Sequence, residues 1–104
     1  MTYAYELIKQ AVLNKHQVTA TYKGHVRMMC PHALGWTNER ERALFYQFGG
    51  TSSTGLGPDG SSKNWLCIFL DELTDISVSP GAWYTAPEHS RPQRCVGQIE
   101  AEAT

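Results

Sequence analysis

The chain has 104 residues, of which 41% are hydrophobic and 18% charged, and its formal net charge is −1. This length fits one domain with a single core. The near-neutral balance argues against a strongly basic nucleic-acid binder, because long-range attraction to phosphate needs excess Lys and Arg. No stretch approaches the roughly 18 apolar residues of a membrane helix, and residues 1–6 lack a signal peptide's basic start. We therefore expect a cytoplasmic protein that does not contact membranes.

The first predicted element is an amphipathic helix over residues 4–13. Apolar side chains recur there at helical spacing, and polar side chains occupy the other face. Thr2 is the candidate N-cap. A helix this short is unstable alone, so its apolar stripe must dock on another element. The stripe consists of Leu7, Ile8, Ala11 and Val12.

Five strands are predicted after the helix, because β-branched and aromatic residues recur between turn-forming residues. Pro31 interrupts the second strand, which predicts an edge position, a bulge or a sharp bend there. Turns are expected at Lys23-Gly24 and at residues 37–40, and a Gly/Ser-rich loop at residues 49–62. The strands are expected at residues 17–22, 25–36, 42–48, 64–70 and 74–79.

These elements predict a mainly β (α+β) fold. Sequential, hairpin-linked strands form a strongly bent antiparallel sheet, and closing it into a small barrel removes the exposed edges. The N-terminal helix then plugs one open end. Residues 1–79 would form this domain and residues 80–104 a C-terminal arm, in which residues 95–99 can pair as a short strand.

The three cysteines, Cys30, Cys67 and Cys95, are an odd number with wide gaps. Neither a disulfide framework nor a CxxC metal knuckle is visible in that spacing. Reduced thiols that serve as small core residues fit it best.

Catalytic and metal-binding templates fit the sequence poorly. The histidines His16, His25, His32 and His89 are scattered, and only Cys30 and His32 share one strand face. No serine stands in a Gly-x-Ser-x-Gly elbow, and the glycine cluster lacks the Gly-Lys-Ser/Thr ending that cradles phosphates. We therefore expect no enzyme activity, no cofactor and no metal site.

A binding site is suggested by arginines and aromatic residues that alternate along the strands. Guanidinium groups beside aromatic faces suit phosphates and stacked bases. Composition alone favours the simpler interpretation, in which the aromatic residues are core and the cations form a solvated face. The residues in question are Tyr22, Arg27, Trp36, Arg40, Arg42, Tyr46, Lys63 and Trp65.

The order of these features resembles the WYL domain of bacteria and their phages over residues 5–79. That family has a strand ending in Tyr-x-Gly, a Pro-x-x-Leu segment, a Trp-Tyr-Leu strand and a Phe-x-Leu-Asp-x-Ile segment. The matching pieces are Tyr22-Lys23-Gly24, Pro31-His32-Ala33-Leu34, Leu44-Phe45-Tyr46 and Leu70-Asp71-Glu72-Leu73. Positions that hold basic residues in the family are Leu66, Phe69 and Glu72 here, and no helix-turn-helix domain is present.

The resemblance implies an Sm-like small β-barrel that acts as a regulatory module and senses a nucleotide or short single-stranded nucleic acid. Carried over by position, the pocket would be shaped by four residues, with charge from two arginines. These residues are Tyr22, Pro31, His32 and Tyr46, with Arg27 and Arg42.

An alternative function is a protein-interaction or oligomerisation barrel without a small-molecule ligand. The family's missing basic residues would then have left an apolar surface for a second copy or another protein. Aromatic side chains are the usual anchors of such interfaces. The candidate anchors are Trp36, Phe45, Trp65, Trp83 and Tyr84.

Overall fold

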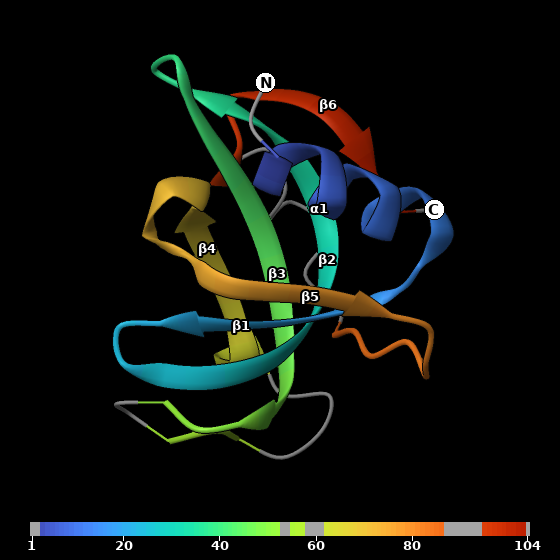
Figure 1. Ribbon diagram of the computed structural model, residues 1–104, viewed down its shortest axis with the longest axis vertical. Helices are drawn as coiled ribbons and strands as arrows, with labels where there is room; N and C mark the ends of the chain where they lie inside the picture. Colours follow the sequence, from blue (N-terminus) through green and yellow to red (C-terminus); the bar gives the residue numbers. More distant parts are fainter. Residues whose placement is uncertain (1–2, 53–54, 58–61, 87–94, 104) are drawn as a thin grey trace.

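The computed structural model describes residues 3–52, 55–57, 62–86 and 95–103 as one helix followed by an antiparallel sheet (Figure 1). The predicted helix, the five predicted strands and the α+β, mostly β class are confirmed in this part of the chain. Thr2, the expected N-cap, lies outside the described residues. The elements are α1 (Tyr3–Asn14), β1 (Gln17–Tyr22), β2 (His25–Thr37), β3 (Arg40–Gly50), η1 (Ser62–Asn64), β4 (Trp65–Phe69), η2 (Leu70–Glu72), β5 (Thr74–Ser79) and β6 (Gln98–Glu102).

The described strands form one six-stranded sheet. Five of them follow the order β4-β3-β2-β1-β5, and the sixth, β6, pairs with β2. β2 is the longest strand, and β3 pairs along most of it. On its other side β2 serves two partners in succession, first β1 up to the Val18↔Met29 pair and then β6 from the Ala33↔Glu102 pair. The sheet is bent strongly enough that β5 crosses in front of β3 in Figure 1.

The prediction of a closed barrel is wrong. β4 and β5 stand at the two ends of the strand order, and no pairing joins them among the described residues. Only the short η2 turn links these two strands, and β5 pairs with β1 at the far end of the sheet. β6 adds a sixth strand, at Gln98–Glu102 instead of residues 95–99.

Both predicted hairpin turns are present and share one conformation. Lys23 and Gly24 have φ values of 51° and 78°, and Asn38 and Glu39 have values of 51° and 67°. Two consecutive positive φ angles are the signature of the type I′ turn, whose twist matches that of the flanking strands. These turns set the registers of the β1–β2 and β2–β3 hairpins.

Pro31 lies at a bulge, as one of the sequence expectations required. The register between β2 and β3 shifts between Pro31 and Ala33. On the opposite side of β2, Pro31 falls in the gap between the β1 and β6 pairings. A residue without a backbone N–H is tolerated there because one ladder bond is already missing.

The core lies between α1 and the inner face of the sheet. α1 buries Tyr5, Ile8, Ala11 and Val12, so Tyr5 takes the place that the sequence pattern assigned to Leu7, which is only half-buried. The Tyr5 ring stacks on Trp36 at a centroid distance of 5.3 Å, and its hydroxyl donates to Glu100 of β6. α1 therefore contacts both β2 and β6.

In the part of the chain that is described, no helix combines the length and the apolar character needed to cross a bilayer.

We predict that Ile8→Ala lowers the free energy of unfolding by about 2–5 kcal/mol, because Ile8 is fully buried and its loss leaves a cavity. Leu13→Ala on the same helix is the control. Leu13 is 57% exposed, so its truncation should change stability by no more than about 0.5 kcal/mol. Urea unfolding of both variants checks this, and equal losses would contradict the placement of the core.

Candidate functional site

A cavity of about 190 Å³ lies beside the β1–β2 turn. This turn stands at the end of the sheet away from α1 (Figure 1). Its described walls come from the β1–β2 turn, the adjoining part of β3, the segment after β3 and the start of β4. Lys23, Arg27 and Lys63 contribute cationic groups, and the described lining contains no carboxylate. The lining residues are Tyr22, Lys23, Arg27, Gln47, Ser52, Gly55, Leu56, Lys63, Asn64 and Leu66.

Arg27 is the central charge of this cavity, and its side chain is only 3% exposed. Its Nε donates to the Tyr22 carbonyl oxygen at 3.1 Å, and its Nη1 donates to Gln47 Oε1 at 3.3 Å. The guanidinium carbon lies 4.9 Å from the centroid of the Tyr22 ring. Burial lowers the pKa of Arg27, but an arginine side chain stays protonated in proteins. The site therefore holds a buried, fixed positive charge.

Gln47 fixes the position of that charge. It is fully buried, and its Nε2 donates to the carbonyl oxygens of Gly49 and Thr51 at 2.9 and 3.0 Å. These bonds orient the amide so that its oxygen faces Arg27. One glutamine thus links β2 to the chain leaving β3.

Asn64 also holds backbone groups through its amide, on the opposite wall of the cavity, and it is 2% exposed. Its Oδ1 accepts from the Gly57 N–H at 2.8 Å, and its Nδ2 donates to the Gly57 carbonyl at 3.1 Å. The amide also reaches the Tyr46 hydroxyl at 3.5 Å. Ser52 contributes a buried hydroxyl that has no hydrogen-bond partner.

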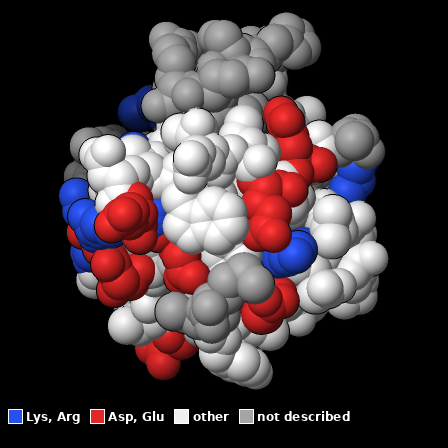
Figure 2. Space-filling model, turned by 90° about the horizontal axis from the view of Figure 1, so that it is seen from above, with Lys and Arg blue, Asp and Glu red and all other residues white. Residues whose placement is uncertain are grey.

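The charged lining of the cavity differs from the surface seen from above in Figure 2. That surface carries acidic side chains, with basic ones beside them, around an uncharged centre. α1 carries an exposed Glu6, and β6 carries the exposed Glu100 and Glu102, of which Glu100 pairs with Lys9. A protein with a net charge of −1 thus has a cavity whose described charged lining is cationic.

The structure places the six site residues expected from the sequence in four locations. Tyr22 and Arg27 line the cavity, and Tyr46 adjoins it through Asn64. The other three lie elsewhere: Pro31 at the β2 bulge, His32 in an aromatic cluster and Arg42 beside a disulfide.

The sequence interpretation named Lys63 among the cations that suggest a binding site, but it did not assign Lys23, Gln47, Ser52 or Asn64 to the site. The position of Gln47 could have indicated the site, because it is a polar residue inside an apolar strand. A buried amide of that kind needs partners, and here it finds Arg27.

His32 belongs to a cluster that holds the chain after β5 against the sheet. Its ring lies between Trp65 and Trp83, at centroid distances of 4.9 and 4.8 Å, and Tyr46 contacts Trp65 edge-on. His32 Nε2 donates to the Tyr84 carbonyl oxygen at 3.0 Å. This bond defines the tautomer, because a carbonyl can only accept.

Cys30 and Phe48 complete the contacts of this segment. The Cys30 sulfur accepts from the Tyr84 N–H at 3.3 Å and donates to the Ala82 carbonyl at 3.8 Å. Tyr84 also stacks on Phe48 at 4.4 Å. Burial raises the pKa of the Cys30 thiol, while the Tyr84 N–H bond lowers it. The described part of the arm is therefore packed on the sheet.

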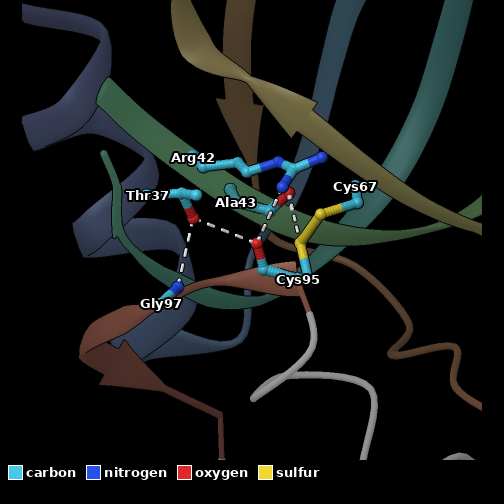
Figure 3. The surroundings of a disulfide bond; sticks show 6 residues. All are labelled: Thr37, Arg42, Ala43, Cys67, Cys95 and Gly97. Atoms are coloured by element: carbon cyan, nitrogen blue, oxygen red, sulfur yellow. Dashed lines mark hydrogen bonds between the residues drawn. A yellow bond between two sulfur atoms is a disulfide. The ribbon is translucent and has the colours of Figure 1, made fainter. Parts of the chain in front are cut away.

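Cys67 of β4 and Cys95 form a disulfide with a Cα–Cα distance of 5.7 Å (Figure 3). The prediction of three reduced thiols is wrong, because a sequence separation of 28 residues hides two positions that the fold brings together. Only Cys30 is free. Disulfides persist mainly in oxidising compartments, so this pairing counts against the expected cytoplasmic location.

The chain around Cys95 is also held by polar contacts. Its carbonyl oxygen accepts from Thr37 Oγ1 at 3.3 Å and from Arg42 Nη1 at 3.2 Å. Thr37 Oγ1 in turn accepts from the Gly97 N–H at 3.1 Å. The Cys95 sulfur lies 3.6 Å from the Ala43 carbonyl oxygen, a packing contact because a disulfide sulfur carries no proton. The Arg42 guanidinium therefore holds the chain segment that leads into β6.

No group of three or more metal-ligating side chains lies together within the described residues.

Removal of the disulfide should lower the free energy of unfolding by about 3.5 kcal/mol, the chain-entropy value for a loop spanning 28 residues. Urea unfolding with and without dithiothreitol measures this, and Cys30→Ala is the control that should retain the reductant sensitivity. Thiol titration of the denatured, unreduced protein should find one reactive thiol, and three would contradict the pairing.

Stability should also fall as the pH drops below about 6.5, the ordinary pKa of histidine. Burial, with a smaller effect of Lys15, lowers the pKa of His32, and the Tyr84 bond only partly offsets it. The unfolded state therefore binds more protons, and stability is lost from pH 6.5 down through the folded pKa. In His32→Phe, the free energy of unfolding measured with urea should depend less on pH below about 6.5. An unchanged pH dependence would show that another group causes the loss of stability.

No protein-family model, curated protein or solved structure matches this chain. The resemblance to the WYL domain stays a prediction from its motifs.

Proposed function

We propose that this chain is a non-enzymatic regulatory module of WYL type that binds an anionic ligand, a nucleotide or a short single-stranded nucleic acid. The observation that carries the proposal is Arg27, a buried guanidinium at the wall of a cavity whose described charged lining is cationic. A buried charge is costly unless it is compensated. A phosphate group would compensate it.

The composition of the cavity supports a nucleotide in particular. Tyr22 presents an aromatic ring that also contacts Lys23, whose ammonium lies 5.3 Å from the ring centroid. Sequence-tolerant binders of single strands combine backbone-tracking cations with aromatic rings on which bases stack. Tyr22, Lys23 and Arg27 bring both chemistries to one end of the β1–β2 hairpin.

Fixed geometry supports a binding function. Gln47 and Asn64 use their amides to hold backbone groups around the cavity. These bonds fix the walls before a ligand arrives, so little conformational entropy is lost on binding.

The aromatic contacts within the chain count against the alternative of a protein-interaction module. Of the anchors expected from the sequence, Phe45 is fully buried, Trp36 stacks on Tyr5, and Trp65 and Trp83 pack on His32. Tyr84 stacks on Phe48. These rings are engaged internally.

Thermal unfolding with nucleotides and short single-stranded oligonucleotides, at low and high salt, tests the proposal. A ligand at 100 times its dissociation constant should stabilise the fold by about 2.7 kcal/mol, a shift of roughly 10 °C or more for this size. The shift should fade at high salt. No shift with any of these ligands would overturn the proposal.

Two lysines provide a matched pair of variants. Lys23 lines the cavity and Lys15 follows α1 at the other end of β1, and both occupy the left-handed region, with φ values of 51° and 55°. Asn is tolerated in that conformation, so both Lys→Asn changes remove one charge without backbone strain. Lys23→Asn should weaken binding and Lys15→Asn should not. Equal weakening of binding by the two variants would indicate nonspecific electrostatic attraction and not binding in the cavity.

A further inference from the structure

We infer that the cavity holds a terminal phosphate monoester of the ligand, as at the phosphorylated end of an oligonucleotide or in a nucleoside monophosphate, and not a phosphodiester within a strand. This inference rests on the proposed function and specifies which part of the ligand enters.

The size of the cavity is the first argument. Its volume of about 190 Å³ is below the ~300–1,000 Å³ of sites that enclose a whole drug-sized ligand. A complete nucleotide therefore does not fit inside, and only one group of it enters. The rest of the ligand lies outside, where Tyr22 stands half-buried at the edge of the cavity.

The charge of the lining is the second argument. A phosphomonoester carries about −1.5 to −2 charges at pH 7, whereas each phosphate within a strand carries −1. Lys23 and Arg27 contribute two cationic groups to the described lining. Two cations match a dianion better than a single negative charge.

The hydrogen-bond donors are the third argument. Arg27 has five N–H groups, and its contacts with Tyr22 and Gln47 occupy only Nε and Nη1. Nη2 has no hydrogen-bond partner among the described residues. The buried Ser52 hydroxyl on the same lining is also unpartnered. A buried hydroxyl without a partner is destabilising, and a monoester, with three terminal oxygens, offers acceptors both to Ser52 and to the unoccupied Nη2 of Arg27.

Arg27 is also held in place before any ligand arrives. Its two hydrogen bonds and the Tyr22 ring leave the guanidinium little freedom. A guanidinium group held in this way loses little conformational entropy when it binds a ligand. Its planar geometry suits the bidentate recognition of phosphate oxygens.

The experiment compares one short oligodeoxynucleotide in three forms: 5′-phosphorylated, 3′-phosphorylated and with hydroxyls at both ends. Binding to the full chain is measured by fluorescence anisotropy, with inorganic phosphate as competitor. At least one phosphorylated form should bind about tenfold tighter or better than the hydroxyl form, because charge-assisted hydrogen bonds are added. This preference should shrink below about pH 6, the second pKa of the monoester.

Ser52→Ala and Arg27→Lys should reduce the preference for the phosphorylated end, and Lys15→Asn should retain it. Ser52→Ala keeps the test valid if the buried Arg27 variant does not fold. Equal affinity for all three forms would overturn this inference and leave the proposed function standing. Absence of binding by every form would overturn the proposed function itself.

Discussion

The pairing of β2 on both of its sides is the constraint on which the rest of the structure depends. β3 runs along one side, and the other side is divided between β1 and β6 at the Pro31 gap. One end of β2 therefore carries β6 and, through it, contacts with α1, while the other end carries the β1–β2 turn and the cavity. Gly35 allows this arrangement, because a Cβ there would collide with the Gln98 backbone of β6.

Local chemistry explains the parts of the fold that the sequence predicted. The α1 stripe is a short-range periodicity, and the Lys23-Gly24 turn depends on the conformational freedom of adjacent residues. Neither needs knowledge of distant contacts. Pro31 likewise had to lie where a ladder bond is absent, and a bulge satisfies that requirement.

Pairings between distant segments were beyond the sequence interpretation for the opposite reason. The Cys67–Cys95 bond and the β2–β6 register each join residues far apart in the chain, and no local pattern encodes which segments meet. Barrel closure was wrong for a related reason. Alternation along a strand defines the face that it buries, but it does not define whether the two edge strands meet.

Arg27 and Arg42 illustrate the same limit at the level of the site. Both are arginines beside aromatic residues in neighbouring strands, and sequence reasoning gave them one role. Arg42 lies opposite Phe69 in the β3–β4 pairing and donates to the Cys95 carbonyl, so it holds the chain before β6. Arg27 lines a cavity whose walls are held by the buried amides of Gln47 and Asn64. Both guanidinium groups keep donors that the protein does not satisfy, so the count of hydrogen bonds does not separate them. The difference is that Arg27 lines the cavity and Arg42 does not, and this placement is the physical basis of the proposal that an anion binds at this end of the sheet.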